Sequence, residues 1–207
     1  MLKRTKGILL LTLLVSTSFA GRISPDTISS QERRFLIDHL KDSKIYLLKA
    51  LKGLSEEQMN FKTSPEKWSI KECVQHIALA EGGIWQMAEG VLKATANPEK
   101  RSEIKVTDQD LIKWVTSRDH KVRAPETMKP VQSAWKTTDE ALAAFKDKRA
   151  ALVKYAKTTT DDMRNHVMQG FPVGHVDAYQ VVLFLSSHTI RHTDQILEVK
   201  NDPSFPK

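Results

Sequence analysis

The stretch DAYQVVLFLSSHTIRHTDQILEVK, from Asp177 to Lys200, decides the fold. It contains no Gly or Pro, and Asp177 followed by Gln180 can satisfy the free amides of a first helical turn. At 100° per residue, a mostly apolar group of side chains falls within about 60° of one direction. These side chains are Val181, Phe184, Leu185, His188, His192, Gln195 and Val199. The pattern predicts a helix that packs one face against partners and carries two histidines on that face.

Three other segments have the same kind of start and the same helical periodicity. They begin at Ser29 with Glu32, at Ser69 with Glu72 and at Thr137 with Glu140, and run to about Leu51, Ala94 and Ala156. Each start pairs an N-cap oxygen with a Glu three residues later, which is the pattern of a capping box. Strand signals are nearly absent, so we predict an all-α four-helix bundle.

The gaps between these segments predict the topology. Residues 53–68 and 157–176 are short enough to join antiparallel neighbours, whereas residues 95–136 are far more numerous and contain three prolines. A connection of that length can travel along a bundle and make the second and third helices parallel. We therefore expect an up-down-down-up order with one long crossover, in which residues 110–118 form a short helix.

The first twenty residues are typical of a secretory signal peptide. Basic residues precede an apolar run over 8–15, and Ser18-Phe19-Ala20 supplies small residues for cleavage after Ala20. We expect residues 1–20 to be removed and residues 21–207 to form one secreted or periplasmic domain without stable membrane insertion. An uncleaved N-terminal anchor is the alternative.

Charge and cysteine usage exclude several classes of protein. The net charge of +7 falls to +4 without the three basic residues of the leader, and the remaining Lys and Arg form no stripe typical of nucleic-acid binding. Cys73 is the single cysteine, so an intrachain disulfide is excluded. We expect a small-molecule substrate and no nucleic acid as partner, and the sequence leaves a homodimer open.

Three histidines stand out as candidate metal ligands. His188 and His192 lie one turn apart on one helical face, and His76 lies on the apolar face of the segment after Ser69. Neutral imidazoles buried in a core need a hydrogen bond or a metal ion. A core histidine bonded to a carbonyl is the alternative for each one, because the meeting of His76 with the other two depends on the register of the helices.

Three nitrogen ligands with remaining open positions are typical of a catalytic zinc site. An ion held in this way makes water acidic enough to act near neutral pH, so hydrolysis is the plainest chemistry. No general base stands out, and we leave the catalytic residues unknown. A non-catalytic metal-binding or structural bundle is the alternative from a different class.

Four other residues are candidates for the substrate or for contacts behind the ligands. Cys73 could reach the ion as a thiolate but is better explained as a small buried side chain. Glu72 could bind the ion, but its role in the capping box competes with ligation. Gln195 is expected one turn beyond His192, in core hydrogen bonding or near the substrate. Arg149 could receive a carboxylate or pair with a buried acid, although we expect it to extend to the rim. His39, His120, His166 and His175 are interpreted as non-ligands.

The residues that carry these signals resemble the DinB-like superfamily of helical-bundle metalloproteins. The matching segments are WSIKECVQHIA, from Trp68 to Ala78, and HTIRHTDQI, from His188 to Ile196. The resemblance extends over about residues 30–200. It implies that His76, His188 and His192 bind one divalent ion, Zn²⁺ or Ni²⁺, and that Trp68 packs at the start of its helix. It also implies a second reading as an enzyme, a metal-dependent thiol transferase.

Overall fold

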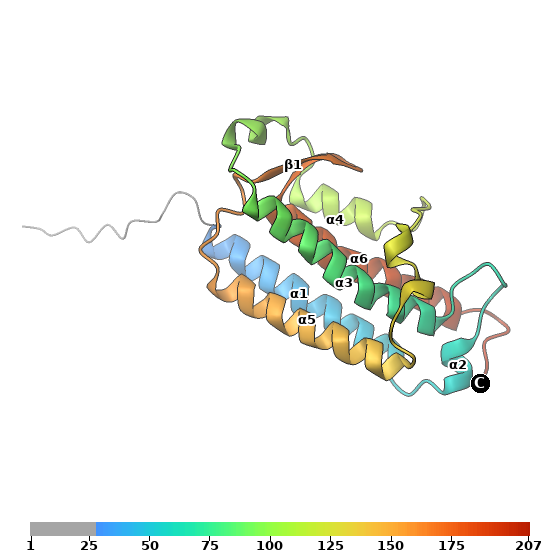
Figure 1. Cartoon of the computed structure of the whole chain (residues 1–207). Coiled ribbons are helices and arrows are strands. Elements are labelled where there is room, and N and C mark those ends of the chain that lie inside the picture. The colour runs from blue at the N-terminus through green and yellow to red at the C-terminus, as the bar shows by residue number, and fades with distance from the viewer. Residues whose placement is uncertain (1–27) are drawn as a thin grey trace, which may run out of the picture.

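The structure, a computed structural model, describes residues 28–207 and contains a bundle of four long helices (Figure 1). These helices are α1 (Ser30–Leu51), α3 (Ile70–Lys93), α5 (Thr138–Thr158) and α6 (Ala178–Lys200). The prediction of an all-α four-helix bundle is confirmed in its class and in the extent of all four helices. The predicted signal peptide, residues 1–20, lies outside the described residues. None of the helices in 28–207 is long and apolar enough to cross a membrane.

All four helices begin with a capping box, as their sequences predict. The side chains of the N-cap residues accept hydrogen bonds from the amides three residues later, and the Glu or Gln at that position bonds back to the N-cap amide. The N-cap residues are Ser29, Ser69, Thr137 and Asp177. Because a capping box uses only residues within one turn, the starts of these helices are encoded locally.

Hydrogen bonds at the two ends of the bundle show how α1 and α6 run. The Tyr179 hydroxyl donates to the Glu32 carbonyl near their N-terminal ends, and Lys200 donates to the Ala50 carbonyl near their C-terminal ends. The two helices are therefore parallel. At the start of α3, His76 meets His192 near the end of α6, so α3 runs antiparallel to α6.

Consecutive helices of the bundle are not always neighbours. In the ring of packed helices, α6 and α5 each lie between α1 and α3, so that α1 and α3 face each other across the bundle. The sequence analysis expected residues 53–68 and residues 157–176 each to join neighbouring helices. Both expectations were wrong, because α5 and α6 also face each other across the bundle. Residues 53–68 form the connection between α1 and α3. The connection is long enough to pass under the end of the bundle, and it includes the short helix α2 (Glu56–Asn60), which packs against α3.

The long connection between α3 and α5 lies along the α3–α6 side of the bundle. It contains η1 (Pro98–Glu103), α4 (Asp108–Thr116), η2 (Glu126–Met128) and η3 (Pro130–Gln132). Helix α4 matches the short helix expected near residues 110–118 and packs on α6, whereas η2 and η3 pack on α3 (Figure 1).

A small β-hairpin corrects the expectation that the segment before α6 is a plain loop. Strands β1 (Val167–Phe171) and β2 (Gly174–Asp177) pair antiparallel with an irregularity in the ladder. Gly170 and Gly174 have φ values of 74° and 102°, which other residues rarely adopt. These two glycines therefore permit the tight turn, and Asp177 ends β2 while it caps α6.

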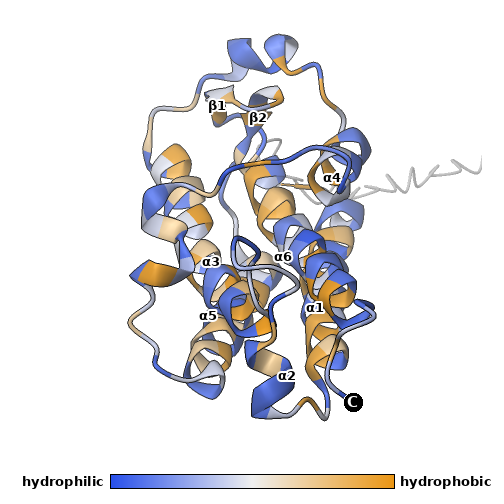
Figure 2. Ribbon diagram, turned by 90° about the vertical axis from the view of Figure 1, so that its right-hand side faces the viewer, coloured by the Kyte–Doolittle hydropathy of each residue, from blue (hydrophilic) through white to orange (hydrophobic). Residues whose placement is uncertain are grey.

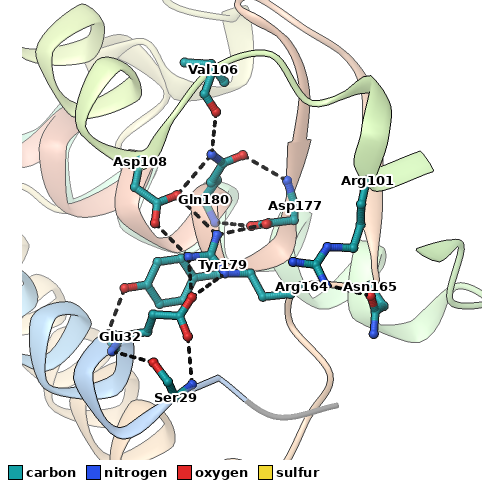
Figure 3. A network of polar contacts seen from close by, with 10 residues as sticks. All are labelled: Ser29, Glu32, Arg101, Val106, Asp108, Arg164, Asn165, Asp177, Tyr179 and Gln180. Atoms are coloured by element: carbon teal, nitrogen blue, oxygen red, sulfur yellow. Dashed lines mark hydrogen bonds and ion pairs between the residues drawn. The ribbon is translucent and has the colours of Figure 1, made fainter. Parts of the chain in front are cut away.

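Arg164, in the segment before β1, ties three helix N-termini together (Figure 3). Its guanidinium donates to Glu32 in the first turn of α1, to Asp108 at the start of α4 and to Asp177 at the cap of α6, at 2.7–3.2 Å. It also lies 3.9 Å from the ring centre of Tyr179. The positive ends of three helix dipoles and one guanidinium thus balance three carboxylates.

A polar layer divides the apolar interior into two parts. Apolar positions face inward on each long helix (Figure 2), and they form one cluster near the hairpin and α4 and another near α2. Between the clusters lie Ser43, Glu81, Arg149 and Thr189, one from each helix and each at most 2% exposed. The expectation that Arg149 extends to the rim was wrong, because Glu81, unremarked in the sequence analysis, pairs with it inside the bundle.

Candidate metal centre

Three histidine nitrogens meet at one point between α3 and α6. The Nε2 atoms of His76, His188 and His192 lie 3.1 Å from one another in all three pairs. Among the described residues, these histidines form the one group of three or more His, Cys, Asp or Glu side chains that could hold a metal ion. The structure therefore brings together the three residues that the sequence analysis singled out.

His76 is positioned by the start of α3. The capping box of Ser69 and Glu72 begins the helix and places His76 in its second turn. Trp68, just before this cap, packs its ring 4.8 Å from the imidazole of His76 and 5.9 Å from that of His192, measured between ring centres. Trp68 thus covers the centre from the side of the α2–α3 connection.

His188 and His192 come from successive turns of α6. Their ring centres are 4.4 Å apart, and each is within 4.9 Å of the ring of His76. A spacing of four residues on a helix is what allows both imidazoles to point at one position. Phe184, one turn earlier, lies 5.9 Å from the ring of His188 and extends the aromatic surroundings.

The centre lies on the flank of the bundle, not in its middle. His76 and Glu81 are about 140° apart on α3 at 100° per residue, so they point to different sides of the helix. Glu81 points into the polar layer, and His76 points to α6 and to the long connection. Met128 of the long connection contacts His76 there.

Hydrogen bonds at the outer ring nitrogens fix the tautomer of two imidazoles. The Nδ1 atom of His76 lies 2.6 Å from the Met128 carbonyl oxygen, and Nδ1 of His192 lies 2.9 Å from Oε1 of Gln195. Both partners accept, so both Nδ1 atoms carry the proton and both Nε2 atoms present a lone pair. Such contacts commonly orient metal-binding histidines.

The arrangement of the nitrogens fits a metal ion. Two lone pairs directed at each other across 3.1 Å repel, whereas a cation placed between them would be attracted to both. Nitrogen ligands about 2.0–2.1 Å from one ion lie roughly 2.8–3.4 Å apart for angles between octahedral and tetrahedral. The observed separations fall inside this range for every pair, so these residues can hold a metal.

Burial keeps the three imidazoles neutral. His76 and His192 are 2% and 8% exposed, and His188 retains some exposure at the outer edge of the centre. Loss of hydration lowers the pKa of His76, although the Met128 carbonyl acts in the opposite direction. Burial and the neighbouring imidazoles hold the pKa values of His188 and His192 well below their usual range. Neutral imidazole is the form that binds metals.

Three of the other candidate residues do not join the centre. Glu72 accepts from the Ser69 amide and pairs with Lys62 at 2.8 Å, so its capping role prevails. Cys73 is fully buried among apolar side chains, and this burial raises the pKa of its thiol. The guanidinium of Arg149 is enclosed in the polar layer.

Gln195 is the remaining candidate, and it lies behind the ligands. Its side-chain oxygen contacts the outer nitrogen of His192. The Met128 carbonyl has the equivalent role for His76. Sequence analysis missed this contact because every residue has a backbone carbonyl, so the residue type does not indicate it.

The other four histidines have partners outside the centre. His39 contacts the Ser186 hydroxyl at 2.7 Å, and His166 contacts the Val91 carbonyl at 3.0 Å. His175 pairs with Glu103, and His120 stacks on Trp114. None of them belongs to the three-histidine group.

A four-helix bundle with three converging histidines on its α3–α6 side defines a class of helical protein suited to hold one metal ion. Comparison with known families then places the chain more narrowly. Residues 39–196 match the model of the DinB superfamily, and the chain belongs to that family. The resemblance drawn from the two histidine segments is thereby confirmed.

Two proteins of Bacillus subtilis are similar to this chain. The uncharacterized protein YuaE of strain 168 is 27% identical over 154 residues, which cover 72% of this chain and 88% of YuaE. The structure of YfiT, described as a probable metal-dependent hydrolase with an unusual four-helix bundle topology, aligns with a TM-score of 0.59. The alignment covers 87% of this chain and 93% of YfiT at 14% identity, so the likeness concerns the fold.

Proposed function

We propose that this protein is a metal-dependent hydrolase that binds one divalent ion through His76, His188 and His192. The observation that carries the proposal is the triangle of Nε2 atoms at 3.1 Å, with the lone pairs of His76 and His192 directed at a common point. YfiT, whose fold is similar, is described as a probable metal-dependent hydrolase, and this supports the same class of reaction.

The ion would supply Lewis acidity, which polarises a substrate carbonyl or phosphoryl group and acidifies water. The protein's part is to hold the imidazoles in one tautomer and one orientation. The Met128 carbonyl does this for His76, and Gln195 does it for His192. Trp68 and Phe184 place aromatic rings beside His76 and His188.

The charges around the centre favour an anionic substrate group. The three ligands are neutral, and the recorded partners of their outer nitrogens are a carbonyl and an amide. No hydrogen bond joins these imidazoles to a carboxylate within residues 28–207. A divalent ion would keep its charge uncompensated by the protein, and buried charge is stabilised by an opposite charge. A carboxylate or phosphate on the substrate would provide it.

The donor set suits Zn²⁺ and Ni²⁺ better than Mg²⁺ or Ca²⁺. Imidazole nitrogen suits both, whereas Mg²⁺ and Ca²⁺ prefer oxygen ligands. Three protein ligands leave further positions for substrate and water, as in catalytic zinc sites.

Metal analysis of tag-free protein tests the first half of the proposal. We expect close to one ion per chain after reconstitution with Zn²⁺ or Ni²⁺, and loss of that ion in His188→Ala. His175→Ala is the matched control, because this histidine pairs with Glu103 away from the centre. Absence of bound ion in reconstituted wild-type protein would contradict the proposal.

Turnover of simple substrates tests the second half. Esters, amides and phosphoesters with and without a carboxylate should be hydrolysed only by the metal-loaded protein, and the anionic members faster. Reaction only when a low-molecular-weight thiol is present would instead support a thiol transferase. A metal-loaded protein inert towards both sets would support a non-catalytic metal-binding bundle.

We also propose that the chain is exported and cut after Ala20. The basic residues, the apolar run and the small residues before the cut support this. N-terminal sequencing of protein recovered from the periplasm or medium of a bacterial host should begin at Gly21. Recovery of the full-length chain in the cytoplasm would contradict the proposal.

A further inference from the structure

The polar layer inside the bundle uses every donor of one arginine. Nε and Nη2 of Arg149 bond the two carboxylate oxygens of Glu81 at 2.6 and 2.8 Å. Nη1 bonds the Leu40 carbonyl and the Ser43 hydroxyl at 2.7 and 2.6 Å, and Nη2 also bonds the Thr189 hydroxyl at 2.9 Å. A guanidinium has five N–H groups, so none is left over.

Stability alone does not explain such a layer. A buried ion pair loses its hydration, and well-packed apolar side chains of similar volume often support a fold equally well or better. What the pair adds is direction, because the planar guanidinium accepts only a narrow range of positions for the carboxylate. The hydrophobic effect between apolar side chains has no such preferred direction.

The layer joins the two helices that carry the histidines. Glu81 lies five residues after His76 on α3, and Thr189 lies between His188 and His192 on α6. Arg149 bonds both Glu81 and Thr189, although it belongs to α5. The planar guanidinium of Arg149 therefore connects α3 and α6 inside the bundle, whereas His76 leaves α3 on a different side.

The histidine centre needs this alignment to be precise. One residue of helix rises about 1.5 Å, whereas metal–ligand distances tolerate about 0.2 Å. A slide of α3 against α6 by a fraction of one residue would separate the nitrogen of His76 from those of the other two histidines. The guanidinium of Arg149 combines burial, direction and hydrogen bonds to both helices.

We propose that Arg149 is a positioning residue for the metal centre. By bonding Glu81 of α3 and Thr189 of α6, it sets the register in which His76 meets His188 and His192. This inference rests on the proposed function for the identity of the ligand, but the register itself is a property of the metal-free chain.

The test compares three variants in metal affinity and thermal stability. The double variant Glu81→Leu with Arg149→Met removes the ion pair without leaving a buried charge, and Thr189→Val removes only the bond to α6. Ser43→Ala is the matched control, because it cuts the bond to α1 and leaves the connection between α3 and α6. Affinity for Zn²⁺ and Ni²⁺ is measured by chelator competition, and Co²⁺ absorption reports the ligand geometry.

We expect the double variant to fold with a Tm near that of the wild type and to bind Zn²⁺ about 10–100-fold more weakly, the loss typical of residues that orient metal ligands. The Co²⁺ spectrum should change. Thr189→Val should lose less affinity, in the same direction, and Ser43→Ala should stay within about twofold of the wild type. If the double variant does not fold, Thr189→Val alone decides. Unchanged affinity and Co²⁺ spectrum in a folded variant that lacks the connection would overturn the inference.

Crystal structures of the metal-free proteins separate this inference from the proposed function. If wild-type protein binds no ion, the proposed function fails, but the register can still be measured. The inference then requires the Nε2 atoms of His76 and His192 to stay near 3.1 Å in the wild type and to move apart in the double variant. Equal separations in the two proteins would overturn it.

Discussion

The polar layer and the histidine centre are both polar clusters with residues of α3 and α6, yet they differ in how they are completed. In the layer, each guanidinium donor of Arg149 has an acceptor, and the charge of Glu81 cancels that of Arg149. In the centre, the inner nitrogens of His76 and His192 face each other as acceptors. In the layer, protein atoms alone supply every hydrogen-bond partner, whereas the facing lone pairs of the centre need a cation between them.

This difference separates structural polar groups from ligand sites. A closed network rigidifies the helices it joins, because any displacement leaves a buried group without a partner. An open cluster of acceptors is costly in the free protein and becomes favourable when a cation enters. The Arg164 cluster resembles the layer, since its three carboxylates are balanced by a guanidinium and by helix N-termini (Figure 3).

The largest effect on stability should come from breaking the hydrogen-bonded network of the polar layer. Arg149→Met leaves the Glu81 carboxylate buried without its partner, and we expect a loss of about 3–5 kcal/mol in the free energy of unfolding. The double variant with Glu81→Leu should recover most of this loss, because no charge is left behind. Urea unfolding of the metal-free proteins measures both. A single variant as stable as the wild type would mean that the layer is not closed as described.

The second-largest effect on stability should come from adding a metal ion to the histidine centre. An ion at a free concentration 100 times its Kd stabilises the folded protein by about 2.7 kcal/mol, or roughly 5–10 °C in Tm for a domain of this size. Zn²⁺ or Ni²⁺ should raise the Tm of the wild type, and a chelator should reverse the rise. In His188→Ala the ion should have little effect, and an equal rise there would place the ion elsewhere.

The two clusters should also differ in their response to pH. Burial lowers the pKa of His76 and, more strongly, that of His192, so the folded metal-free protein keeps these groups neutral where the unfolded chain protonates them. The free energy of unfolding should therefore fall as the pH decreases below about 6.5, by up to about 1.4 kcal/mol per pH unit for each such histidine, and it should be flat above that pH as far as these groups are concerned.

Urea midpoints between pH 5 and pH 8 measure this dependence. His192→Gln keeps a polar side chain without an ionisable ring, so the metal-free variant should show a shallower fall below pH 6.5 than the metal-free wild type. His39→Gln is the comparison variant. Burial also lowers the pKa of His39, but this histidine lies between α1 and α6, away from the centre. A wild type whose stability rises as the pH falls would contradict neutral burial of the centre.

The helices were predictable from sequence because their signals are local. A capping box and an apolar stripe involve residues within one or two turns, and the start at Ser69 was placed correctly for that reason. The hairpin was missed because Gly170 and Gly174 are equally typical of loops. Its strands are short and acquire their pairing only from the turn between them.

The convergence of the histidines could be proposed but not established from sequence. His188 and His192 share a face by their spacing alone, whereas the approach of His76 depends on how α3 is placed against α6. We infer that Arg149 and Glu81, which are distant in sequence, contribute to that placement beside the direct packing of α3 on α6. Arg149 was expected at the rim because a lone arginine usually extends to solvent, and Glu81 gave no sign of pairing with it.

A smaller effect should follow from weakening the contact behind one ligand. Gln195→Ala removes the acceptor at the outer nitrogen of His192, and we expect a loss of about 10-fold in affinity for Zn²⁺ with little change in metal-free stability. Gln195→Glu keeps an acceptor and makes the imidazole a better donor of its lone pair, so its affinity should equal or exceed that of the wild type. Equal losses in both variants would show that the contact does not act through His192.

The smallest effect on the centre should come from Cys73, although it lies only one turn before His76. Its thiol is fully buried in the apolar cluster near α2, and burial raises its pKa, so the thiolate that a metal would need is disfavoured. Cys73→Ala should leave Zn²⁺ affinity within about twofold and lower the free energy of unfolding by about 1 kcal/mol through lost packing. Folded protein should also resist a thiol reagent until urea exposes the side chain. A large loss of affinity in Cys73→Ala, with the fold intact, would mean that the open cluster has a fourth ligand and that its charge is no longer neutral.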